Sequence, residues 1–273
     1  MPFAETPLRD EYAAAVERVA GRTLDALRGG GGTAALADPD TVVPRPLLAA
    51  VRVLGADLFA PQLLTGAEPD GPTAALLAEA RRAFPAPVPA SPEAAQAIAW
   101  QDWAAGRVLA RTPYADTAPG SVPDSASDHV PDRVPGHGPG HAPGSASDRG
   151  PGHAPDHVPA PLPGPAELGW QAWSVRMAQL SVLALPGLDG PVHDAARTDH
   201  LALARGAVRA MLRRDFTTAV RLARWLAWAG AEDRPPHLEV EPILDRIRLV
   251  GIGAVRTRLE LAIAERLSEG NPR

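Results

Sequence analysis

The segment RRDFTTAVRLARWLAWAG, residues 213–230, carries tryptophans at 225 and 228 in the tetrapeptide WLAW. The same Trp-x-x-Trp spacing occurs in WQDW at 100–103 and in WQAW at 170–173, and these three tetrapeptides hold all six tryptophans of the chain. Residues three apart lie on one face of an α-helix, so each pair predicts a broad aromatic patch on a helix. Since only 4% of the residues are aromatic, each tryptophan contributes strongly to any core.

Two hypotheses explain the tryptophan pairs. Alanine-rich helices fill little volume, so large rings can supply the core where three helices meet, each contributing on the order of 2–3 kcal/mol of burial. Alternatively, the rings wall a pocket for an apolar, cationic or planar ligand, with nearby histidines giving polar chemistry. The candidate ligand-binding residues are Trp100, Trp103, Trp170, Trp173, Trp225, Trp228, His193 and His200.

Helical periodicity covers most of the chain outside its middle. Capping residues, prolines and glycines bound the expected helices, as with Ser91-Pro92 at a start, Asp215 before another helix and Gly230 at its end. The expected helices span 7–28, 46–59, 72–84, 92–111, 165–185, 191–213, 216–230, 242–250 and 253–268. Only HLEVE at 237–241 alternates like a strand. The sequence therefore predicts an all-α fold, a helical bundle of about eight or nine helices.

Residues 113–165 interrupt this pattern. They are rich in Pro, Gly, Ser, His and Asp, and repeat SASD, GHAP and DHVP twice each. Such a segment buries too little apolar surface to offset its ordering entropy, so we expect a disordered linker. It separates an N-terminal helical part, 1–112, from a C-terminal part, 166–273. Because each part is short, we expect the two to share one core.

Five of the eight histidines lie in this linker, at His129, His137, His141, His153 and His157. These histidines have three possible interpretations. The linker is a solvated spacer whose histidines came with the repeats, or it loosely captures nickel or zinc, or it is a spacer whose charge changes near pH 6. The spacing matches no structural metal site, and a flexible segment must be ordered to gather ligands. We expect no metal site and no cofactor.

Composition limits the classes of function. The chain has 273 residues, no cysteine and no lysine, so disulfides, thiolate metal sites and cysteine nucleophiles are excluded. A net charge of −5 and a pI near 5.9 argue against a general binder of nucleic acid or anionic membranes. The first residues lack the pattern of a secretory signal, and no uncharged apolar stretch is long enough to span a bilayer. A cytoplasmic protein without membrane contact is expected.

His193-Asp194 and Asp199-His200 form a polar cluster in the helix expected at 191–213. On one continuous helix the two histidines share a face but lie about 10 Å apart along the axis. They are therefore too distant to bind one metal ion together. We expect a structural role for the cluster and keep a general base at His193 or His200 as the alternative.

Arg205, Arg209 and Arg213 follow i, i+4, i+8 spacing and align on one helix face. Arg214, Arg221 and Arg224 extend the expected basic patch onto the next helix. Three interpretations are a solvated face, a surface for an acidic protein partner and a nucleic-acid surface. Arg205, Arg209 and Arg213 are the candidate partner-binding residues.

The segment 213–230 also resembles the second helix of a tetratricopeptide repeat at Asp215, Phe216, Ala219 and Val220. The resemblance covers about half of one repeat, and no 34-residue period follows. It implies packing of a helix hairpin, as in protein–protein adaptors, and does not identify the chain as a member of that family.

No nucleophile elbow, phosphate loop or dinucleotide fingerprint occurs in the sequence. The preferred hypothesis is a soluble helical interaction or accessory protein that binds a protein partner. The alternative is a helical enzyme or small-molecule binder with a tryptophan-walled pocket, which leaves enzymatic activity an open question. The oligomeric state is not indicated.

Overall fold

A computed structural model describes residues 5–30, 43–113, 158–231, 239–250 and 253–270. All its regular structure is helical, and no strand occurs in these ranges. The fold is an all-α bundle, as predicted. Its α-helices are α1 Glu5–Leu27, α2 Arg45–Leu54, α3 Ala60–Thr65, α4 Gly71–Ala83, α5 Pro92–Leu109, α6 Pro165–Leu168, α7 Trp170–Gln179, α8 Pro191–Thr198, α9 His200–Leu212, α10 Phe216–Gly230, α11 Glu241–Val250 and α12 Val255–Glu269. The described residues also include the 3₁₀ segments η2 Gly55–Phe59 and η3 Ser181–Leu183.

Local capping explains where several helices begin. The Ser91 hydroxyl accepts a hydrogen bond from the Ala94 amide at 3.2 Å at the start of α5. The Asp215 carboxylate accepts one from the Thr218 amide at 3.0 Å at the start of α10. Such caps satisfy amides that have no partner within the helix, and both were predicted.

The described residues hold more and shorter helices than the eight or nine predicted. The helix expected over 165–185 is broken at Gly169, whose φ of 75° lies in the region that glycine adopts most easily. The helix expected over 191–213 is interrupted at Asp199, between α8 and α9. The helix expected over 46–59 changes to 3₁₀ geometry at Gly55, where φ is 55°. The apolar pattern typical of a helix continues through Gly169, Asp199 and Gly55, so the sequence did not predict these three breaks.

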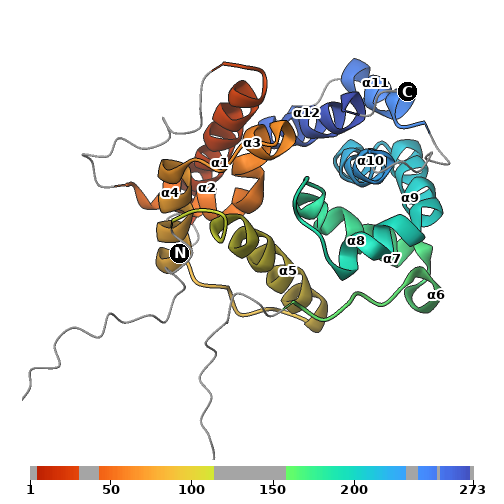
Figure 1. The fold of residues 1–273 in the computed structure, drawn as a ribbon, viewed down its shortest axis with the longest axis horizontal. Coiled ribbons are helices and arrows are strands. Elements are labelled where there is room, and N and C mark those ends of the chain that lie inside the picture. Colours follow the sequence, from red (N-terminus) through yellow and green to blue (C-terminus); the bar gives the residue numbers. More distant parts are fainter. Residues whose placement is uncertain (1–4, 31–42, 114–157, 232–238, 251–252, 271–273) are drawn as a thin grey trace, which may run out of the picture.

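Helix α10 lies at the centre of the C-terminal half (Figure 1). It packs against α9, α12, α7 and α11, while α12 also packs against α1 of the N-terminal half. Buried apolar side chains from both halves, such as Leu54 and Ile263, belong to one continuous hydrophobic cluster. The domain boundaries at 112 and 166 stay a prediction.

Most of the predicted linker, residues 114–157, lies outside the described residues, together with its five histidines and the hypotheses attached to them. Its last part does not follow the prediction of disorder. Residues 158–164 form no helix and accept hydrogen bonds from Gln96 and Trp100 of α5, with Pro159 buried and Leu162 partly buried against the core. HLEVE at 237–241 is described only from 239 onward, and Glu241 begins α11.

One helical segment, Arg45–Thr65, is long and apolar enough to cross a membrane by length and composition, and 56% of its apolar window is buried inside the protein. A core helix of a soluble protein passes the same test, so the segment is weak evidence for a membrane span. The absence of membrane contact stays a prediction.

Candidate functional site

Tryptophans from α5 and α10 meet around a histidine of α8. The ring centroids of Trp100 and Trp103 are 5.3 Å apart, and those of Trp225 and Trp228 are 5.7 Å apart, both pairs edge to face. The His193 ring lies 4.8 Å from Trp228, 5.4 Å from Trp225 and 6.4 Å from Trp103. All five rings are buried. Edge-to-face contacts stabilise aromatic pairs beyond their buried area, so this cluster fixes the packing of three helices.

His193 links α8 to η3. Its Nε2 lies 2.9 Å from the carbonyl oxygen of Leu183. Because a carbonyl only accepts, Nε2 carries the proton and donates it. His200 is half-buried, with Nδ1 3.2 Å from the Arg197 carbonyl oxygen. The prediction that both histidines share one helix face is wrong, because α8 ends at Thr198 and α9 begins at His200. A general-base role for either histidine stays a prediction.

The remaining tryptophans differ in exposure. Trp173 of α7 is buried, whereas Trp170 is half-buried and lies under the Arg209 guanidinium, 5.7 Å from its ring centroid. The Trp225 indole N–H donates to the Met177 carbonyl oxygen at 2.8 Å and so fastens α10 to α7. The prediction that the tryptophans fill the core is confirmed for five of the six. The ligand-pocket hypothesis stays a prediction.

A buried ion cluster lies one residue before Trp225. The Arg224 side chain is fully buried, and its guanidinium donates to Asp57 Oδ1 at 2.7 Å, to Glu260 Oε2 at 2.8 Å and to the Ala184 carbonyl oxygen at 3.2 Å. We call Arg224, Asp57 and Glu260 the buried ion cluster. Its members come from α10, η2 and α12, so it joins both halves of the chain.

Two more side chains complete the partners of Glu260. The Ser181 hydroxyl donates to Glu260 Oε1 at 3.0 Å, and Arg221 Nε donates to the same oxygen at 3.3 Å. Buried charges are tolerated in proteins when they are paired and hydrogen-bonded. Every side chain of this group is already engaged, so the arrangement serves as a structural junction. The predicted basic patch is therefore wrong for Arg224, which is fully buried, whereas Arg221 is partly exposed and paired with Glu260.

Sequence reasoning missed this cluster, although one signal was present. From Ala219 to Trp228 the sequence AVRLARWLAW is apolar on nearly every side of the helix, with only Arg221 and Arg224 charged. A helix that is apolar all round is a buried helix, and an arginine within it needs buried acids. Asp57 sits in the apolar segment GADLF, which predicts burial in the same way.

The two carboxylates of the cluster have pKa values shifted in opposite directions. Burial raises the pKa of Asp57 above its ordinary value of 3.8, and the Glu260 charge adds to that rise against the opposing effect of Arg224. Burial also acts to raise the pKa of Glu260, but the charges of Arg224 and Arg221 outweigh it and hold the pKa below 4.5. Glu260 has two cationic partners where Asp57 has one, which explains the difference.

These shifts predict opposite pH dependence for Asp57→Asn and Glu260→Gln. The folded state holds the Asp57 proton more tightly than the unfolded state, so wild-type stability relative to Asp57→Asn increases as pH falls through the folded pKa toward 3.8. The stabilisation from ionised Glu260 is present above 4.5, so the deficit of Glu260→Gln shrinks as pH falls through its lower folded pKa. Each tenfold difference in proton affinity corresponds to about 1.4 kcal/mol. Urea unfolding between pH 7 and 3 measures both trends, and parallel profiles for the two variants would contradict them.

The outer face of α9 is exposed and carries both apolar and basic side chains. Leu201, Val208 and Leu212 are 48%, 43% and 81% exposed, and Arg205 is exposed between them. Positions 201, 205, 208 and 212 follow helical spacing and form one stripe, which we call the α9 stripe. Arg209 and Arg213 lie beside it, half-buried and exposed respectively. The structure therefore keeps the three predicted partner-binding arginines on or beside one surface.

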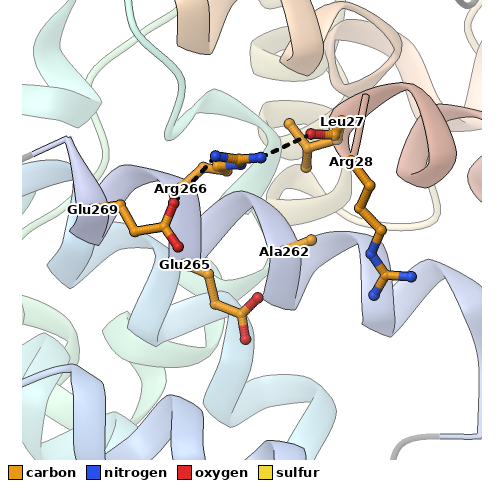
Figure 2. A pocket seen from close by; sticks show the side chains of 6 residues that line it. All are labelled: Leu27, Arg28, Ala262, Glu265, Arg266 and Glu269. Atoms are coloured by element: carbon orange, nitrogen blue, oxygen red, sulfur yellow. Dashed lines mark hydrogen bonds and ion pairs between the residues drawn. The ribbon is translucent and has the colours of Figure 1, made fainter. Parts of the chain in front are cut away.

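A second surface feature is a small pocket of ≈ 190 Å³ between α1 and α12 (Figure 2). Its lining residues are Leu27, Arg28, Ala262, Glu265, Arg266 and Glu269. Arg266 already bonds Glu269 at 3.3 Å and the Leu27 carbonyl oxygen at 3.4 Å, and Glu265 bonds Arg248. The volume is below that of ordinary ligand sites. Among the described residues, no group of three or more His, Asp or Glu side chains could hold a metal ion.

Comparison with protein families, with curated proteins and with solved structures finds no match to the chain. The fold and the surfaces described above define an all-α protein with a buried aromatic cluster, a buried ion cluster and an exposed amphipathic helix face.

Proposed function

We propose that the protein is a non-enzymatic helical interaction protein whose α9 stripe binds an acidic amphipathic helix of a protein partner. The observation that carries the proposal is the exposure of Leu212, Leu201 and Val208 in one row on a helix. Scattered exposed apolar residues are normal on protein surfaces, but an aligned row rimmed by charge is typical of an interaction site.

The charges beside the row favour an acidic partner. Neither Arg205, Arg209 nor Arg213 forms an ion pair with another described residue, and Arg209 is held over the Trp170 ring. Three arginines along one helix face give a positive surface on a protein whose net charge is negative. Such a local field steers an oppositely charged segment and repels a basic one.

The length of the row favours a helix as the bound element. Leu201 and Leu212 are separated by roughly 16 Å along the α9 axis, which equals about three helical turns. An amphipathic helix can place apolar residues at i, i+4, i+7 and i+11 against such a row and acids at its edges. The α9 packing partners, α7 and α10, cover the opposite side of the helix, which leaves the row open.

The test uses a fluorescein-labelled helical peptide with leucines at i, i+4, i+7 and i+11 and glutamates at the flanking positions, titrated with the full chain. Leu212→Ser should weaken binding at least tenfold, because burying a leucine contributes about 1.5–3 kcal/mol and about 1.4 kcal/mol corresponds to a factor of ten. Leu249→Ser is the matched control, because Leu249 is 80% exposed on α11, which packs against α10 and α12. Arg205→Glu should weaken binding most at low salt. Equal affinities for Leu212→Ser and Leu249→Ser, or no binding to wild type, would overturn the proposal.

A further inference from the structure

Two proline-rich segments of the chain share one pattern. Residues 85–90 read PAPVPA, and residues 159–164 read PAPLPG. Each precedes a helix with a Trp-Gln-x-Trp sequence, α5 in the first case and α7 in the second. The shared pattern Pro-Ala-Pro-x-Pro favours an extended backbone and removes three amide donors.

The second segment, residues 159–164, is bound by two side chains of α5. The Gln96 side-chain amide donates to the carbonyl oxygens of Ala160 at 3.2 Å and Pro161 at 3.0 Å, and the Trp100 indole N–H donates to Ala160 at 3.2 Å. Leu162 packs partly buried against the core. An indole and an amide that donate to the carbonyls of an extended proline-rich chain form the arrangement by which aromatic grooves bind such peptides. We call Gln96 and Trp100 the α5 seat.

The first segment, residues 85–90, has the same sequence pattern but is not bound to the α5 seat. Residues 85–90 are all exposed, and Val88, which corresponds to Leu162, is 95% exposed. No described residue donates a hydrogen bond to the carbonyls of this segment. An extended proline-rich segment loses little conformational entropy on binding, so it is ready to be bound.

The segment 85–90 cannot easily reach the α5 seat of its own copy. It enters α5 directly, with Ser91 capping the helix and Pro92 in its first turn. Gln96 lies only five residues after Ser91, so the chain would have to reverse at the capped end to lie beside its own helix. A second copy has no such constraint.

We propose that PAPVPA at 85–90 binds the α5 seat of a second copy of this chain in place of that copy's 159–164. Ala86 and Pro87 present carbonyl oxygens in the positions of Ala160 and Pro161, and Val88 fills the place of Leu162. The exchange is reciprocal, because each copy carries one seat and one exposed segment, so two copies close into a symmetric dimer. The tethered segment 159–164 competes with it and keeps the exchange weak at low concentration.

The experiment weakens the competing segment in the full chain. Leu162→Ser removes its apolar contact and leaves Gln96 and Trp100 in place. A fluorescein-labelled peptide of residues 83–91 should bind Leu162→Ser at least tenfold more tightly than wild type, and adding Gln96→Ala should abolish that gain. Sedimentation equilibrium should show a concentration-dependent dimer of Leu162→Ser that Val88→Asp in the same chain removes.

Circular dichroism confirms that each variant keeps its helices, and Leu162→Ala provides a milder substitution should Leu162→Ser lose them. A Leu162→Ser chain that binds the peptide no better than wild type would overturn the proposal. So would a Leu162→Ser chain that stays monomeric at every concentration, or a dimer that Val88→Asp leaves unchanged.

Discussion

Arg224→Met lowers the free energy of unfolding by about 3–5 kcal/mol, because it leaves the carboxylates of Asp57 and Glu260 buried without their shared cation. The Arg224 side chain is 0% exposed and donates to both acids at less than 3 Å. Methionine fills much of the same volume, so the loss reports the charges rather than a cavity. Urea unfolding at pH 7, followed by far-ultraviolet circular dichroism, measures the change.

Two further variants distinguish the loss of the buried ion pairs from a general loss of stability on replacing an arginine. Arg221→Met removes one partner of Glu260, and the Arg221 side chain is 26% exposed. Glu260 keeps its hydrogen bonds to Arg224 and Ser181. Its cost should be about 1 kcal/mol or less. The triple variant Asp57→Asn, Arg224→Met, Glu260→Gln removes every charge of the cluster and should recover most of the stability lost in Arg224→Met. Equal losses for Arg221→Met and Arg224→Met would contradict the assignment.

The expected result also bears on how the two halves hold together. Asp57 and Arg224 are 167 residues apart in sequence. Substitution of Arg224 should therefore loosen the contact between η2 and α10 as well as the packing within the C-terminal half. Hydrogen exchange of α2 and α10 should increase together in Arg224→Met, whereas Arg221→Met should leave α2 protected.

The sequence predicted those elements whose signals are local. Ser91 and Asp215 cap helices as expected. Each side-chain oxygen accepts a hydrogen bond from an amide only three residues later, so the interaction depends on local sequence alone. The tryptophan pairs predicted a core for the same reason, since residues three apart must share a helix face. Helix class and most helix starts therefore followed from residues that interact over one turn.

The parts that could not be predicted depend on distant partners. Arg224 stands among arginines that look alike in sequence, and only contact with Asp57 and Glu260 distinguishes it from exposed Arg205. His193 and His200 looked like one face of a helix because nothing local shows that the chain turns at Asp199. Gln96 gave no signal at all, because its partners are backbone carbonyls some 64 residues later.

Gly206→Ala should also lower the stability of the protein, and it tests the packing of α7 on α9. A Cβ at Gly206 would lie 2.5 Å from Ser174 Cβ, 2.8 Å from Ser174 Oγ and 3.0 Å from Leu222 Cδ1. Ser174 Cβ is fixed to the α7 backbone, so the two helices must move apart. Alanine favours a helix over glycine by about 1 kcal/mol, yet overpacking costs about 1–3 kcal/mol and prevails here. Thermal unfolding should show a lower Tm.

A reciprocal change of size at Ser174 decides whether close approach is the cause. Ser174→Gly removes both atoms nearest the new methyl group, so the double variant Ser174→Gly, Gly206→Ala should be more stable than the sum of the single effects, by about 1–3 kcal/mol. Gly106→Ala in α5 is the control, because its Cβ would meet only the flexible end of Arg81 at 3.7 Å. That variant should gain up to about 1 kcal/mol from helix propensity. If Gly206→Ala also gains stability, the helices are not held at the distance that Ser174 and Gly206 require, and the seating of α9 with its exposed stripe would have to be revised.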